Sequence, residues 1–188
     1  KEECFFGAGE VVKDLKELRY TGAIYPIHPT SSSVYGLKIY PDISGVEGKI
    51  DLAVIVTSYR SVPGILESCG RKGVKAAVVI SDGFAENGDE GRVRQAAIIA
   101  IAQEKGIRII GPNTLGIYKP HAGISTIPYE KGYNLPPKGG LSIITQTGMY
   151  GPQAVAMNEY SFGTNTIIDL GNMCDIDEVD CLEYLGSD

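Results

Sequence analysis

The sequence predicts an α/β fold with a parallel sheet, followed by the beginning of a second α/β unit. Short apolar, β-branched runs alternate with segments of helical character, in the order 52–56, 61–71, 76–80, 90–105 and 107–110. Continuous apolar runs of this length are typical of parallel strands that are buried on both faces. Gly73 and Gly106 each follow one of the helical segments, which is where a helix is expected to end.

The residues on either side of this core predict further elements. We expect strands at 4–6 and 23–27, a helix at 10–20 whose apolar residues recur at helical spacing, and a short extended piece at 37–40. Residues 118–138 are rich in Pro, Gly and Tyr, which favours a connecting segment with short strands.

The strand and helix pattern starts again at Gly139. It predicts strands at 141–144 and 164–170, with helices at 150–160 and 177–185. Two strands and two helices are too few to close a doubly wound unit. We therefore expect one domain at residues 1–133 and a truncated second domain at residues 138–188, whose last helix leaves an apolar face uncovered at Val179, Leu182 and Leu185.

Composition argues against several classes of partner. The net charge of −6 is unfavourable for binding nucleic acid or an anionic membrane. No apolar run reaches the roughly 18 residues that span a bilayer. The four cysteines are far apart and form no C-x-x-C pair, which favours reduced thiols in a cytoplasmic protein. With only two histidines, we expect no metal site.

Small polar residues follow each strand of the core. Ligands of parallel sheets bind at the carboxyl ends of the strands, so these residues predict a row of ligand-binding loops. Helix capping is the alternative role for the hydroxyl residues, and a bond to its own backbone is the alternative for the asparagine. The residues are Thr57 and Ser58, then Ser81, Asp82 and Gly83, and finally Asn113.

The first turn, FFGAGEVV, is similar to half of a dinucleotide-binding fingerprint. Gly7 and Gly9 would let the backbone approach a phosphate at a helix amino terminus. Val12 takes the place of the third glycine, and His28 stands where an NAD site has an acidic residue. These departures argue against an NAD(P)-dependent oxidoreductase, and leave a tight strand-to-helix turn as the alternative.

Several longer strings carry a family resemblance. IYPIHP, YGLKIYPDI, GVKAAVVISDGFAE, GIRIIGPNTLGI and KGGLSIITQTGMYG occur in this order along the chain. They resemble the NDP-forming acyl-CoA synthetases, the superfamily that includes the succinyl-CoA synthetase α subunit. The resemblance covers nearly the whole chain. It implies a Rossmann-like CoA-binding domain followed by the first part of a flavodoxin-like ligase domain.

The resemblance also implies site residues. The turn at Gly7 would lie by the CoA pyrophosphate, Pro29 and Thr30 by its adenine and ribose, and Asn113 near the pantetheine and thiol. The full set of implied CoA contacts is Gly7, Ala8, Pro29, Thr30, Thr57, Ser58, Ser81, Asp82, Gly83 and Asn113.

A second implied site lies in the Thr-Gln-Thr-Gly turn. Thr147 and Gly148 resemble the family's Ser-x-Ser-Gly turn, where a helix amino end faces a phosphohistidine. Free N–H groups and the helix dipole suit a phosphoryl group. An ordinary helix cap by Thr147 is the alternative.

The chain also departs from the family. Its first turn is short, and Glu10 would lie unfavourably near a pyrophosphate. The phosphohistidine lies farther along than this chain reaches, so no catalytic residue is expected, and His121 belongs to a loop. There is no P-loop. ATP or ADP and Mg would act only in the complete enzyme, with an ATP-grasp domain or subunit.

The resemblance therefore predicts the CoA-binding portion of an acid–thiol ligase that is inactive alone. The alternative is a CoA-responsive or nucleotide-responsive regulatory module attached to another catalytic unit, such as an acetyltransferase.

Overall fold

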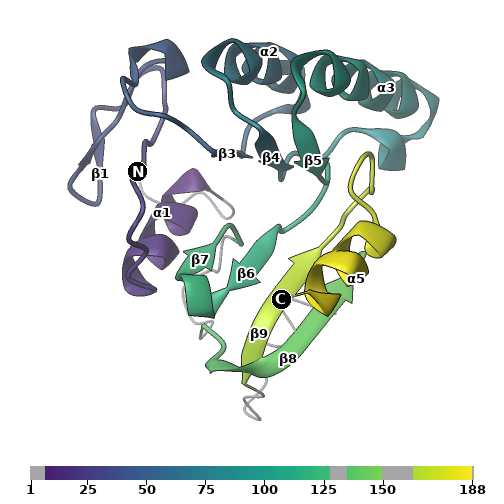
Figure 1. The fold of residues 1–188 in the computed structure, drawn as a ribbon. Helices are drawn as coiled ribbons and strands as arrows, with labels where there is room; N and C mark the ends of the chain where they lie inside the picture. Colours follow the sequence, from purple (N-terminus) through teal and green to yellow (C-terminus); the bar gives the residue numbers. More distant parts are fainter. Residues whose placement is uncertain (1–6, 128–134, 150–162, 188) are drawn as a thin grey trace.

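The computed structural model describes residues 7–127, 135–149 and 163–187. It confirms the predicted α/β fold with a parallel sheet. Strands β3 (Leu52–Ile55), β4 (Ala76–Val79) and β5 (Arg108–Ile110) are parallel and lie in the order β3-β4-β5. Helices α2 (Val62–Lys72) and α3 (Gly88–Lys105) connect them and cover one face of this sheet, as Figure 1 shows.

The main core lies between this sheet and its two helices. Val62 and Leu66 of α2 and Ile98 of α3 are fully buried against apolar strand residues such as Val79 and Ile109. The helices end where the sequence predicts, since Gly73 and Gly106 both adopt the left-handed conformation that caps a helix. Short 3-10 turns precede the helices, at η2 (Tyr59–Ser61) and η3 (Ala85–Asn87).

The amino-terminal part agrees only partly with the predictions. Helix α1 (Ala8–Glu17) begins directly after Gly7 and lies on the side of the sheet opposite to α2 and α3 (Figure 1). The prediction of a regular strand at 23–27 is wrong, because only Ile27 forms a single parallel bridge, to Tyr40. Pro26 has no N–H to donate to a ladder. Strands β1 (Ser33–Val34) and β2 (Leu37–Lys38) form a hairpin, followed by η1 (Ile43–Gly45). The expected strand at 4–6 lies outside the described residues.

A second sheet holds the carboxyl-terminal strands. Its order is β7-β6-β9-β8, with β8 and β9 parallel and the other pairs antiparallel. The strands are β6 (Ile117–Lys119), β7 (Ile124–Ser125), β8 (Lys138–Thr145) and β9 (Thr164–Asp169), and η4 (Pro120–Ala122) stands between the first two. The short strands predicted for the connecting segment are therefore present, and they join the sheet of β9. The division at residues 133 and 138 stays a prediction.

Helix α5 (Glu178–Gly186) follows β9. Its apolar residues Val179 and Leu182 are 56% and 61% exposed, as the sequence predicts, whereas Leu185 is half-buried. The expected helix at 150–160 lies outside the described residues. Among the residues described, no helix has the length and apolarity needed to cross a bilayer.

The two sheets share a hydrophobic cluster. Val78 of β4 and Ile110 of β5 pack with Ile168 and Leu170, which belong to β9 and the turn after it. Backbone bonds extend this contact, since the N–H groups of residues 172, 174 and 176 donate to the carbonyls of residues 112, 111 and 109. The turn after β9 is thereby fixed against the end of β5.

Candidate functional site

Ser81 links the three strand ends of the parallel sheet. It is buried, its Oγ accepts a hydrogen bond from the N–H of Thr57 at 3.4 Å, and its carbonyl accepts one from the N–H of Asn113 at 2.9 Å. The residues that cap η3 and α3 are Phe84 and Asn87, so Ser81 does not act as a helix cap. The structure thus brings together predicted site residues from three loops.

Ser58 acts as a helix cap, which is the alternative role predicted for the hydroxyl residues. Its side chain caps η2 by accepting a hydrogen bond from the N–H of Arg60 at 3.4 Å. Thr57 is exposed, and its hydroxyl donates to the carbonyl of Ser58 at 3.3 Å. Both residues are exposed at the carboxyl edge of the sheet. A contact of this loop with a ligand is therefore compatible with the cap that Ser58 forms.

The loop after β4 packs against an aromatic ring. Gly83 has a φ of +91°, and a Cβ at this position would lie 2.6 Å from the Tyr59 ring. The guanidinium groups of Arg60 and Arg94 each lie 4.6 Å from the centre of that ring. Arg94 also donates to the Gly83 carbonyl at 2.7 Å. Asp82 is exposed beside this cluster. The arrangement places two cationic groups next to the predicted ligand loops.

Asn113 adopts a φ of +58°, a conformation that asparagine tolerates better than most residues. Its side chain is exposed and donates to Oδ1 of Asn172 at 3.4 Å. The partner of its amide is therefore another loop rather than its own backbone.

The first turn presents a helix amino terminus without an intervening loop. Gly7 caps α1 in an extended conformation, and Ala8 is exposed. Among the described residues, nothing beyond the helix itself lies within 4 Å of the position that a Cβ on Gly9 would take. Glu10 forms an ion pair with Lys13 at 3.4 Å, which offsets the carboxylate that would otherwise oppose an anionic ligand.

Pro29 and Thr30 lie in an exposed turn with its own hydrogen bonds. Nδ1 of His28 accepts from the N–H groups of Thr30 at 3.3 Å and Ser31 at 3.2 Å. His28 therefore has a structural role in shaping this turn. Among the described residues, the hydrogen bonds of His28 run within this turn and to the carbonyl of Tyr40, and none joins it to the strand-end loops.

The predicted phosphoryl turn lies close to the segment that follows β5. Gly148 approaches Leu115, and a Cβ on it would lie 2.3 Å from Cδ1 of Leu115 and 3.4 Å from Oδ2 of Asp169. Thr147 Oγ1 accepts from the N–H of Met149 at 3.4 Å, which is a local turn bond. Leu115 follows Asn113 by two residues, so the two predicted sites are neighbours.

Asp169, at the end of β9, supports this junction. Its carboxylate accepts from the N–H of Leu115 at 2.6 Å and of Gly171 at 3.3 Å. Burial raises the pKa of the Asp169 carboxyl, and these hydrogen bonds offset part of that effect. Sequence reasoning missed this residue because β9 was interpreted only as a buried strand.

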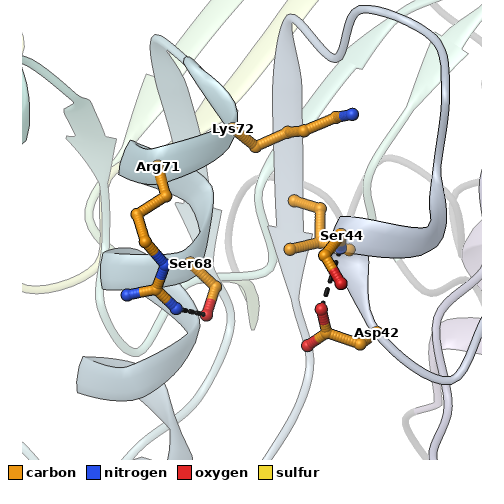
Figure 2. Close-up of a pocket in the computed structure, with 6 residues that line it drawn as sticks. Asp42, Ser44, Ser68, Arg71 and Lys72 are labelled. Carbon is orange, nitrogen blue, oxygen red and sulfur yellow. Dashed lines mark hydrogen bonds between the residues drawn. The ribbon is translucent and has the colours of Figure 1, made fainter.

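A separate pocket of about 230 Å³ lies between η1 and α2, and none of the predicted site residues lines it. Figure 2 shows two hydrogen bonds in its lining: Arg71 donates to Ser68 at 2.8 Å, and Asp42 accepts from the Ser44 N–H at 2.8 Å. The third charged group, Lys72, donates to the carbonyl of Val46. The Ser44 hydrogen bond lowers the pKa of Asp42. The pocket is lined by Asp42, Ile43, Ser44, Ser68, Arg71 and Lys72.

Comparison with known families decides the assignment. A model of the CoA binding domain matches residues 8–120, which contain α1 and all three loops of the parallel sheet. This chain belongs to that CoA-binding domain family. A second model, the succinyl-CoA ligase like flavodoxin domain, matches residues 138–188, which contain the Thr147 turn. The resemblance to NDP-forming acyl-CoA synthetases that the sequence suggests is therefore confirmed.

The relatives of this chain are considerably longer proteins. The chain is 41% identical over 182 residues to an ADP-forming acetate–CoA ligase of Methanocaldococcus jannaschii, and the match covers 95% of this chain and 24% of that protein. It is 38% identical to the α subunit of ADP-forming acetate–CoA ligase II of Pyrococcus furiosus, covering 94% of this chain and 38% of that subunit.

A solved structure has the same fold over nearly the whole of this chain. It is a dinucleotide forming acetyl-coenzyme A synthetase 1 of Ca. Korarchaeum cryptofilum, in complex with phosphate and ADP. The TM-score is 0.85 at 32% identity, and the match covers 95% of this chain and 38% of that one. The chain thus spans about a quarter to two fifths of the length of these relatives.

Proposed function

We propose that this chain is the CoA-binding portion of an NDP-forming acyl-CoA synthetase, which converts an acid, CoA and ATP into an acyl-CoA, ADP and phosphate. In the proposed sequence ATP phosphorylates a histidine, and the phosphoryl group passes to the acid. The CoA thiol then attacks the carbonyl carbon of the acyl phosphate, and the carbon–oxygen bond breaks to release phosphate. The observation that carries the proposal is the match of residues 8–120 to the CoA binding domain. This range contains the three strand-end loops that Ser81 joins by hydrogen bonds.

The residues present suit an extended anionic ligand such as CoA. The amino terminus of α1, which no side chain caps, offers N–H groups to a pyrophosphate, and nothing beyond the helix crowds the Cβ position of Gly9. The guanidinium of Arg60 is held over Tyr59 beside the strand-end loops. Asn113 would face the pantetheine end. In this proposal the chain binds and orients CoA, while the acid and the nucleotide are handled elsewhere in the complete enzyme.

The remaining parts of the reaction need other domains. We propose an ATP-grasp domain or subunit as the partner that brings ATP and Mg, and a cytoplasmic location. The α-subunit naming of a Pyrococcus furiosus relative supports a partner, because that name implies at least one further subunit. The gene context of the chain tests this, since a histidine-bearing segment and an ATP-grasp sequence should accompany it.

Isothermal titration tests the CoA site. CoA should bind the chain, and NAD should bind more weakly or not at all, because no acidic residue stands where an NAD site needs one. Asn113→Ala should weaken CoA binding, whereas Arg71→Gln, in the separate pocket of Figure 2, should leave it unchanged. Tighter binding of NAD than of CoA would refute the proposal.

We propose that Thr147 and Gly148 hold the phosphoryl group. The approach of Gly148 to Leu115, next to the Asn113 loop, supports this. In the complete enzyme, Thr147→Ala should slow phosphoryl transfer and leave CoA affinity nearly unchanged. If Thr147 only caps a helix, the same change should cost about 1 kcal/mol of stability and leave transfer intact.

A further inference from the structure

One side chain, that of Asn172, lies where three strand-end loops meet. Asn172 follows β9, and in Figure 1 the loop between β9 and α5 lies beside β5. Its own N–H donates to the carbonyl of Pro112, after β5, at 2.9 Å. The approach is close, since a Cβ on the preceding Gly171 would lie 2.4 Å from the Pro112 carbonyl oxygen. These backbone contacts therefore place Asn172 at the carboxyl edge of the parallel sheet, where CoA is proposed to bind.

The Asn172 amide uses both its donor and its acceptor ends. Nδ2 donates to Oε2 of Glu86 at 2.5 Å and to Oε1 of Gln95 at 2.9 Å, while Oδ1 accepts from Asn113 at 3.4 Å. An amide can donate to a carboxylate and accept from a second amide at once, whereas an ionised carboxylate can only accept. Aspartate has the same shape but would place a second carboxylate against Glu86.

Glu86 connects Asn172 to the loop after β4 by hydrogen bonds. Its Oε1 accepts from the N–H of Gly83 and, at 2.9 Å, from that of Phe84. Partial burial raises the pKa of Glu86, but its bonds with Asn172 and these N–H groups outweigh burial and lower the pKa below the ordinary value. Glu86 is thus a stable anionic acceptor. Gln95, the other partner, also accepts from the N–H of Ala85 at 3.2 Å.

We propose that Asn172 is a positioning residue that sets the loop after β4 and Asn113 in register for the pantetheine end of CoA. This inference rests on the proposed CoA-binding function. Asn172 lies in the segment matched to the flavodoxin-like domain, whereas its partners lie in the CoA-binding segment. The second segment therefore completes the CoA site from outside the loops that bind the ligand.

Arg108 provides a matched control. It also joins the two segments, through Asp175 at 3.0 Å and Asp180 at 3.2 Å, but it stands at the amino end of β5, away from the ligand loops. Both Asn172→Asp and Arg108→Ala should lower the melting temperature of the chain. Only Asn172→Asp should weaken CoA binding in titration calorimetry, by about tenfold, which corresponds to about 1.4 kcal/mol.

A reversed pair tests the hydrogen bond itself. Adding Glu86→Gln to Asn172→Asp lets a Gln amide donate to the new carboxylate while its oxygen still accepts from Gly83. This double variant restores the bond between positions 86 and 172 but not the one to Gln95, so it should recover part of the lost CoA affinity. Equal CoA affinity of Asn172→Asp and the wild-type chain, or equal losses in Asn172→Asp and Arg108→Ala, would overturn the inference.

Amide hydrogen exchange of the chain without CoA separates this inference from the proposed function. Asn172→Ala should speed exchange at the N–H groups of Gly83 and Phe84, and Arg108→Ala should not. If the wild-type chain fails to bind CoA, the proposed function is wrong and the role in positioning CoA falls with it. If CoA binds but exchange at Gly83 and Phe84 is unchanged in Asn172→Ala, the positioning role is wrong and the proposed function stands.

Discussion

Gly83 gives a prediction at the scale of a single residue. Gly83→Ala should destabilise the chain for two reasons, the positive φ of +91° and the overlap with the Tyr59 ring. The unfavourable backbone conformation costs about 1–2 kcal/mol, and overpacking adds about 1–3 kcal/mol. Gly73→Ala is the matched control, because Gly73 has a similar φ of +83° and open space around it. Urea unfolding should show the larger loss for Gly83→Ala; equal losses would mean that the Tyr59 contact contributes nothing.

Individual residues in the strand-end loops divide into those that the sequence could place and those it could not. Ser81 and Asn113 could be placed at strand ends because each lies within three residues after an apolar strand. The pairing of Asn172 with Glu86 could not be predicted, because the hydrogen bond joins positions 86 residues apart. No local pattern signals such a pairing. Whether Ser58 serves as a cap also needed the structure, because capping depends on where η2 begins.

Glu86 predicts a pH dependence. Its folded-state pKa lies below the ordinary value of 4.5, so its ionised form stabilises the fold fully above that pH. This contribution is lost as pH falls through the folded-state pKa. The stability difference between the wild type and Glu86→Gln should therefore be constant near neutrality and shrink below about pH 4.5. Melting temperatures measured from pH 3 to 7 check this, and a difference that grows toward acid pH would contradict it.

Whole elements could be predicted more reliably than their pairing. The helices of the parallel sheet lie within about two residues of the predicted ranges, because apolar spacing and terminal glycines both mark them. The strand at 23–27 failed because apolar composition was weighed without the missing N–H of Pro26. The acids at the start of α5 correctly indicated a helix start, and Asp177 forms a reciprocal capping box with Asp180.

The cap of α5 can be tested directly. Asp177→Ala removes the side-chain acceptor for the N–H groups of Val179 at 2.9 Å and Asp180 at 3.1 Å. The expected cost is about 1 kcal/mol of unfolding free energy. Glu178→Ala is the control, since this exposed acid should cost only about 0.3–1 kcal/mol through the helix dipole. The account of the cap fails if chemical denaturation finds the larger loss for Glu178→Ala.

At the scale of the whole molecule, the arrangement depends on contacts that periodicity does not encode. Apolar runs predicted the strands, yet the pairing of β6 with β9 and the cluster that joins Val78 to Ile168 are long-range. These contacts place the turn after β9 against the end of β5. The predicted CoA loops and the predicted phosphoryl turn thereby become neighbours.

The most direct test of this account is a nuclear magnetic resonance titration of the chain with CoA. Backbone amide shifts should change most at residues 7–9, 57–58, 81–83 and 113, with smaller changes around Asn172. Residues 42–44, 68, 71 and 72, which line the pocket of Figure 2, should stay unchanged. Shifts concentrated in that pocket, or no shifts at the carboxyl edge of the parallel sheet at saturating CoA, would contradict the central claim.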